Sequence, residues 1–317
     1  MKRLSFLFIT FFLAYFLNAQ NESFNNGDCN FFGENINNNN YQKYIDTIET
    51  SDVAHSLTEE EFHQLIDCLY AIDSINPKLN FYKAICSENG NINDTSFFRY
   101  YRFCIDHGFM KGDAYYNMGC FFINMLFDWK ENDSLVLFDY SREEQKKFFN
   151  LAEEYYWRSY KSGLKEAVFG IGDIQDLKSD YLKVPKPEIN LNQDSIIILT
   201  KIRDCGEFGG HFETIYLTNK DDAYNAHFLS DSVYCFIETK TIIPSLNSKY
   251  NGVNELISKG LLLNLINDIN SYSNDYGALT NAPVQIAIIS NEQVLYQRIQ
   301  NSRWSKYLEF RQKAFNF

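Results

Sequence analysis

The sequence predicts an α+β chain of two domains: an all-α domain of repeat-like helical hairpins, followed by a small α+β domain with a mostly antiparallel sheet. Up to residue 183, apolar residues recur at helical spacing. Residues 184–193, VPKPEINLNQ, hold two of the five prolines, interrupt that pattern and are predicted to be the linker between the two domains. After residue 193, short apolar, β-branched runs come first and helical stretches later, an order typical of α+β domains.

The first residues have the layout of a secretory signal peptide. Lys2 and Arg3 precede the apolar run LSFLFITFFLAYF, and Ala19 provides a small residue for cleavage, so we predict a signal over 1–19. The run is shorter than the ~20 residues of a spanning helix, and we expect no membrane span after cleavage. The sequence therefore predicts export to the periplasm or the cell exterior, with residues 20–40 as a flexible, Asn-rich leader.

Residues 41–183 form the predicted helical domain. In SLTEEEFHQLIDCLYAID, Thr58 and Glu61 have the spacing of a capping box at the start of a helix. The apolar stripe of this helix has the spacing i, i+3, i+4, i+7 and consists of Phe62, Leu65, Ile66 and Leu69. A later aromatic-rich helix over SFFRYYRFCIDHG ends at Gly108, which can take a left-handed conformation.

Two stretches between residues 97 and 177 share a pattern. Each has an aromatic pair, a glycine seven residues after the second aromatic, and an alanine five residues before another glycine. The corresponding residues are Tyr100–Tyr101 and Tyr155–Tyr156, Gly108 and Gly163, Ala114 and Ala167, and Gly119 and Gly172. The pattern predicts a helix that ends at a glycine, followed by a helix that uses small residues to approach its neighbour closely.

This order resembles the Sel-one-type, tetratricopeptide-like helical repeat, in two degenerate copies over about residues 95–177. The copies lie 55 residues apart, farther than such repeats usually recur, which favours a compact helical domain over a continuous solenoid. The resemblance implies a scaffold that binds proteins. Ordinary helical hairpins that share glycine stops are the alternative.

One helix carries four neighbouring aromatic residues: Tyr155, Tyr156, Trp157 and Tyr160. A single helix cannot direct all four into one core, so part of this set is predicted to bind a protein partner. The alternative is that they pack on the aromatic helix at 97–104.

The α+β domain is predicted over 194–317. Strands are expected in SIIILTKIR, HFETIYLT, VYCFIET and PVQIAIIS, and a terminal helix in SRWSKYLEFRQKAF. A long helix is expected over GVNELISKGLLLNLINDINSYS. Its predicted inward residues are Leu256, Ile257, Leu263, Ile266 and Ile269.

The stretch CGEFGGHFETIYL raises the question of chemistry. Cys205, Glu207 and His211 could form a reaction centre if the two glycines between them fold the chain back, with the thiolate as nucleophile and the imidazole as base. A zinc site would need His227 and Cys235 as further ligands, without the spacing that makes such a site convincing, so we predict no metal.

The third interpretation, which we favour, is a Gly-Gly turn between two strands. It leaves Glu207 and His211 exposed and pairs Cys205 with Cys235 in a disulfide across the sheet. The string EFGGH is similar to a turn in uncharacterised exported Bacteroidota proteins, a resemblance that implies no particular activity.

Charge and short motifs disfavour two classes of function, nucleic-acid binding and dinucleotide binding. Lys and Arg number 29 against 41 Asp and Glu, and removal of Lys2 and Arg3 would leave 27 against 41, a charge of −14 that disfavours nucleic-acid binding. GIGD at 170–173 lacks the rest of a dinucleotide fingerprint, and we expect no cofactor. The sequence therefore favours an exported, non-enzymatic protein-interaction scaffold. The alternative is a periplasmic or secreted hydrolase centred on Cys205, Glu207 and His211.

Overall fold

The computed structural model describes the chain in segments. These are residues 29–31, 34–48, 57–88, 95–129, 135–202, 209–231, 233–235, 242–243, 252–272, 284–299 and 305–316. The chain divides into two compact units, one ending at Lys165 and the other beginning at Glu166. No helix among these residues is long and apolar enough to cross a membrane.

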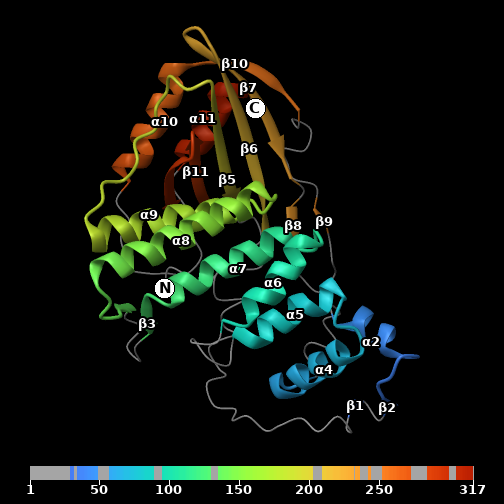
Figure 1. The fold of residues 1–317 in the computed structure, drawn as a ribbon. Helices are drawn as coiled ribbons and strands as arrows, with labels where there is room; N and C mark the ends of the chain where they lie inside the picture. Colours follow the sequence, from blue (N-terminus) through green and yellow to red (C-terminus); the bar gives the residue numbers. More distant parts are fainter. Residues whose placement is uncertain are drawn as a thin grey trace. The chain divides into compact units, whose positions relative to one another are not determined.

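The first unit is mainly helical. From α4 onward, each helix packs on the one that follows it along the chain, which gives the row of helices in Figure 1. The helices are α2 (Tyr41–Thr47), α4 (Glu59–Ile72), α5 (Pro77–Glu88), α6 (Phe97–Asp106), α7 (Lys111–Asn124) and α8 (Arg142–Lys161). Two short antiparallel pairs accompany them: β1 (Asn30–Phe31) with β2 (Glu34–Asn35), and β3 (Phe127–Trp129) with β4 (Leu135–Leu137).

The helix boundaries follow local signals in the sequence. The predicted capping box is confirmed: the Thr58 side chain accepts a hydrogen bond from the backbone of Glu61, and the Glu61 carboxylate accepts one from the backbone of Thr58. Ser141 and Glu144 form a second capping box at the start of α8, which was not predicted. Each box satisfies two backbone donors that a helix start leaves without partners.

The predicted glycine stops are also present. Gly108 after α6 has a φ of +70° and Gly163 after α8 a φ of +104°, a conformation that side-chain-bearing residues rarely adopt. In α7, Gly119 faces Tyr156 of α8, where a Cβ would lie 2.9 Å from the tyrosine ring. The absence of a side chain at Gly119 therefore lets α7 and α8 approach each other closely.

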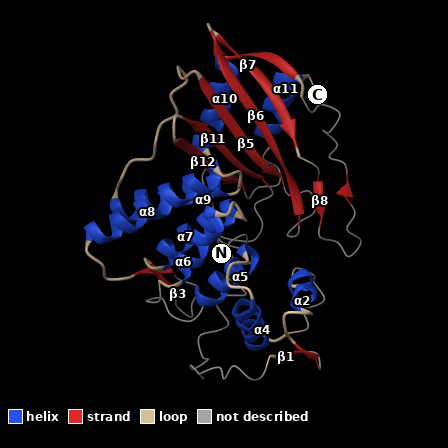
Figure 2. Cartoon of the chain, turned by 45° about the vertical axis from the view of Figure 1, so that its right-hand side comes forward, coloured by secondary structure: helices blue, strands red, loops and turns tan. Residues whose placement is uncertain are grey.

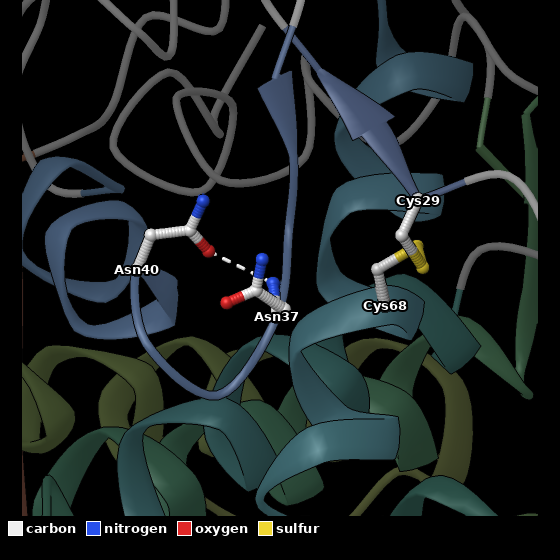
Figure 3. The surroundings of a disulfide bond; sticks show 4 residues. All are labelled: Cys29, Asn37, Asn40 and Cys68. Carbon is white, nitrogen blue, oxygen red and sulfur yellow. Dashed lines mark hydrogen bonds between the residues drawn. A yellow bond between two sulfur atoms is a disulfide. The ribbon is translucent and has the colours of Figure 1, made fainter.

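A disulfide fixes the start of the first unit. Cys29 and Cys68 are bonded, 39 residues apart in the sequence, and this bond ties the β1 region to α4 (Figure 3). Beside it, the backbone of Asn37 donates to Asn40 Oδ1 at 2.8 Å (Figure 3). Disulfides persist in oxidising compartments, so this bond is compatible with export. Cys86 and Cys104 are free and buried, as expected for cysteines used as small core residues.

The second unit is an antiparallel sheet with helices on both faces. Its main strand order is β10-β7-β6-β5-β11-β12, with β8 paired to β6 and β9 to β8. The strands are β5 (Ser195–Ile202), β6 (Gly209–Lys220), β7 (Ala223–Ser230), β8 (Val233–Cys235), β9 (Ile242–Ile243), β10 (Asn254–Ser258), β11 (Val284–Ser290) and β12 (Gln293–Ile299). The helices are α9 (Ala167–Leu182), α10 (Lys259–Ser271) and α11 (Lys306–Phe315). Every described pairing is antiparallel, which confirms the predicted α+β class.

The two faces of this sheet carry different residues, because side chains alternate along a strand. Ile215 and Leu217 of β6 belong to the core that α10 and α11 cover. These two helices lie behind the strands in Figure 2. Phe212 of the same strand points the other way and stacks on Phe169 of α9, with ring centroids 6.1 Å apart. Phe169 also contacts Tyr296 of β12, which places α9 on that second face.

Two boundaries differ from those predicted. Helix α9 was expected in the helical domain, ahead of a linker at 184–193, but it packs on β11 and β12 and belongs to the second unit. The long helix expected from residue 252 begins only at Lys259, because Asn254–Ser258 form strand β10 beside β7. Leu256, which is in that strand, is therefore 60% exposed rather than inward. Leu263 is also exposed, because the buried face of α10 consists of Leu262, Leu265, Ile266 and Ile269.

Candidate functional site

The structure describes only part of the predicted reaction centre. Cys205 and Glu207 lie outside the described residues, as does any pairing of Cys205 with Cys235. The Gly-Gly turn was wrong: Gly209 and Gly210 begin strand β6 and pair with Cys235 and Tyr234 of β8. An extended backbone at both glycines continues the ladder, so the chain does not reverse there.

His211 was expected to be exposed in that turn, and this too was wrong. Its side chain points into the core face of β6 and is 5% exposed. Its Nε2 lies 3.1 Å from Oε1 of Glu213, which follows two residues later on the same face and is itself fully buried. Residues i and i+2 of a strand share a face, and this spacing brings the two side chains together.

Helix α11 supplies the other partners of Glu213. The Tyr307 hydroxyl donates to Glu213 Oε2 at 2.7 Å, and the Arg311 guanidinium donates to Oε1. Burial raises the pKa of Glu213, but its bonds to His211, Arg311 and Tyr307 lower it by more, so that the pKa lies below its ordinary value of 4.5. We call these four residues, His211, Glu213, Tyr307 and Arg311, the buried ionic cluster.

The buried ionic cluster joins α11 to the sheet. A carboxylate that orients an imidazole also occurs in hydrolases, where the imidazole must reach the substrate as a general base. Here the same carboxylate is shared with Arg311 and Tyr307, and the imidazole is covered. This arrangement favours a structural role. A buried carboxylate needs hydrogen-bond or ion-pair partners, and His211, Tyr307 and Arg311 each provide one for Glu213.

The four predicted binding residues on α8 separate into three positions. Tyr156 is 1% exposed and packs on Gly119 and Tyr116, so it belongs to the core. Trp157 and Tyr160 are half-buried and contact each other edge to face at 6.0 Å. Tyr155 is half-buried on another side of the helix, where it meets aromatic residues of α7.

Tyr155 is one member of a row of half-buried rings that crosses α6, α7 and α8. Phe122 stacks on Tyr155 at 5.6 Å and on Phe148 at 6.3 Å, and it contacts Phe98 at 5.7 Å. Tyr115 lies 6.3 Å from Tyr155. We call these five residues, Phe98, Tyr115, Phe122, Phe148 and Tyr155, the aromatic strip. Each of the five side chains is half-buried, and ring-to-ring contacts connect all of them.

Two arginines lie at one end of the aromatic strip. The Arg158 guanidinium is 5.6 Å from the Tyr155 ring centre and 5.9 Å from that of Tyr115, and it also pairs with Glu154 at 2.6 Å. Burial raises the pKa of Tyr155, while the charges of Arg158 and Arg102 act to lower it. Arg102 follows Phe98 by one turn on the same face of α6. Arg102 is exposed and makes no ion pair with a described residue.

Among the described residues, no three His, Cys, Asp or Glu side chains gather closely enough to hold a metal ion. His227 of the zinc hypothesis bonds instead to Asn254 of the neighbouring strand β10, with Nδ1 and Oδ1 2.8 Å apart. No family model, curated protein or solved structure matches the chain. The resemblance to Sel-one-type repeats therefore stays a prediction.

Proposed function

We propose that this chain is an exported, non-enzymatic interaction protein whose helical unit binds a protein partner through the aromatic strip. The single observation that carries the proposal is the continuity of five half-buried rings over three consecutive helices. Aromatic residues and arginine are enriched at the energetic centres of protein interfaces, because they bury a large area at little entropic cost.

Export rests on two features that are independent of the strip. The first 19 residues have the pattern of a signal peptide. The Cys29–Cys68 disulfide fits the oxidising compartment to which such a signal leads.

The helix arrangement supports an interaction role over a catalytic one. Helices α6, α7 and α8 pack in chain order, and half-buried rings of all three contact one another, as in helical scaffolds whose binding surface is built from consecutive helices. The strip and its neighbours provide aromatic rings and guanidinium groups, which are common at protein–protein interfaces. The buried ionic cluster in the other unit is enclosed and used for packing.

Photo-crosslinking in the producing cell tests the proposal. A benzoyl-phenylalanine at position 155 replaces one half-buried aromatic ring by another and should form a discrete covalent adduct with a second polypeptide. The same residue at Leu308, exposed on α11, is the control and should form no such adduct.

A second variant separates specific contact from chance proximity. Phe148→Ser removes one ring of the strip while position 155 keeps its crosslinker, and the adduct should disappear with helicity unchanged by circular dichroism. Adducts that are identical from positions 155 and 308, or that survive Phe148→Ser unchanged, would refute the proposal.

A further inference from the structure

The aromatic strip is polarised along its length. Phe122, near the end of α7, contacts Phe98 at the start of α6 and Phe148 in the first half of α8, so neighbouring helices run in opposite directions. Phe98 and Phe148 contact Phe122 at one end, and Phe122 also stacks on Tyr155, which leads to the other end. Tyr155 and Tyr115 lie at the other end, with Arg158 over both rings. Arg102 follows Phe98 by one turn on the same face of α6, in the direction of that end. One end is therefore apolar, and the other is aromatic and basic.

The basic end stands out against the charge of the chain. The protein carries a formal charge of −12, yet Arg158 stands over the Tyr155 and Tyr115 rings, and Arg102 follows Phe98 by one turn of α6. Glu154 is already paired with Arg158. Arg102 is exposed and forms no ion pair with a described residue. Its guanidinium can therefore donate hydrogen bonds to a carboxylate of a partner molecule.

The distance between the two ends of the strip determines how far apart an apolar ring and a carboxylate must lie on a bound polypeptide. Phe148 and Tyr155 are seven residues apart on α8, which at 1.5 Å per residue is about 10 Å along the helix. An extended polypeptide advances about 3.3 Å per residue, so about three residues span this length. A segment with an apolar ring at one position and a carboxylate three positions away matches both ends at once.

We propose that the aromatic strip binds an extended polypeptide segment in which an aromatic residue and an acidic residue lie three positions apart. The aromatic residue stacks among Phe98, Phe122 and Phe148. The carboxylate pairs with Arg102 and with the donors of Arg158 that Glu154 leaves available. This inference rests on the proposed interaction role and specifies the chemistry of the partner.

Labelled octapeptides in a background of glycine and serine test the inference with the full exported chain. The first peptide carries Trp and Glu three positions apart, the second carries them adjacent, the third replaces Glu by Gln, and the fourth replaces it by Lys. Fluorescence anisotropy should show tightest binding of the first. We expect affinity to fall about tenfold for the lysine peptide, where repulsion replaces attraction.

A charge exchange gives the sharper readout. Arg102→Glu should weaken the Trp-Glu peptide about tenfold, strengthen the Trp-Lys peptide, and leave the Gln peptide within about twofold. Lys146→Glu makes the same charge change on α8, two residues and about 200° from Phe148, and should alter none of these affinities.

The outcomes separate this inference from the proposed function. If all four peptides bind equally and lose binding in Phe148→Ser, the acidic specificity is wrong while the strip remains a binding surface. If soluble oligosaccharides bind in place of the peptides, or if no peptide binds while the crosslink from position 155 persists, the polypeptide chemistry stated here is wrong. Reversal of preference by Arg102→Glu but not by Lys146→Glu supports it.

Discussion

Gly172 of α9 lies against Tyr296 of β12 so closely that a Cβ on the glycine would come within 3.0 Å of the tyrosine side chain. In the sequence pattern, Gly172 corresponds to Gly119, which faces Tyr156. Both glycines permit close approach to a tyrosine. One does so between two helices and the other between a helix and the sheet.

We expect Gly172→Ala to destabilise the second unit. The added methyl group would displace Tyr296, whose hydroxyl accepts a hydrogen bond from Arg298, which in turn pairs with Asp173. Overpacking of this kind costs about 3 kcal/mol, and the better helix propensity of alanine offsets about 1 kcal/mol, so the free energy of unfolding should fall by about 2 kcal/mol. Urea unfolding measures it.

Gly260→Ala is the matched control for that variant. Gly260 is also in a helix, but a Cβ added there would meet nothing closer than the Ser258 hydroxyl at 4.0 Å. Its substitution should change the free energy of unfolding by less than about 1 kcal/mol, in the stabilising direction. Equal effects of the two substitutions would contradict the close-approach argument.

The parallel between Gly119 and Gly172 also shows what the sequence could not reveal. Spacing predicted that small residues would serve close approach, and both glycines do so. Spacing does not name the neighbour, because the partner of Gly172 lies more than 120 residues later in the chain. The domain boundary was therefore placed after α9, although α9 packs on the sheet.

Among the strands that were not predicted, β7 and β12 were missed for a related reason. β7 alternates Tyr224, Ala226 and Phe228 inward with Asn225 and His227 outward, so its mean hydropathy is low. β12 follows β11 through a two-residue turn at Asn291 and Glu292, both with positive φ. That geometry suits a hairpin, but glycine, its usual signal at the second position, is absent.

For the buried ionic cluster and the aromatic strip, the sequence analysis identified individual residues but not the neighbours that complete each site. His211 was identified, while Tyr307 and Arg311 are brought to Glu213 across more than 90 residues by the packing of α11. Tyr155 was identified, but its neighbours Phe122 and Tyr115 come from the preceding helix. In both cases the chemistry depends on which helix packs where, which periodicity alone does not determine.

Glu213→Gln should destabilise the second unit and reduce its sensitivity to acid. The substitution leaves Arg311 without its buried counterion, at a cost of about 3–5 kcal/mol at neutral pH. The pKa of Glu213 is lower in the folded state than its ordinary 4.5, so the folded state binds fewer protons in the acid range. Its contribution is present above pH 4.5 and is lost as the pH falls through the folded-state pKa.

Urea unfolding at pH 7 and at pH 3 measures this linkage. The wild-type free energy of unfolding should fall more between the two pH values than that of Glu213→Gln. Glu255→Gln, which changes an exposed carboxylate on strand β10, should retain the wild-type dependence. If Glu213→Gln and the wild type showed the same pH dependence, Glu213 would not be the charged centre of the cluster.

Loss of the Cys29–Cys68 bond should destabilise the first unit. The bond closes a loop of 39 residues, and the chain-entropy relation for such a loop gives about 4 kcal/mol. The double variant Cys29→Ser, Cys68→Ser should therefore unfold at lower urea concentration. Dithiothreitol should lower the wild-type midpoint more than that of the double variant, in which only the predicted Cys205–Cys235 bond remains to be reduced. A reductant effect of equal size in both proteins would assign the stabilisation to another bond.

Cys86 and Cys104 should resist alkylation in the native protein. Burial raises the pKa of the Cys104 thiol to about 12 and raises that of Cys86 as well, so little reactive thiolate exists near neutral pH. Iodoacetamide labelling followed by peptide mapping should show both cysteines modified on the order of 100-fold more slowly in buffer than in urea, since reaction requires local opening. Labelling at equal rates in both conditions would contradict their burial.

The same peptide map tests the predicted Cys205–Cys235 bond. If the bond is present, these two cysteines should stay unlabelled in urea and become labelled after reduction. Rapid labelling of Cys205 in the native chain would instead indicate a stabilised thiolate and favour the hydrolase hypothesis.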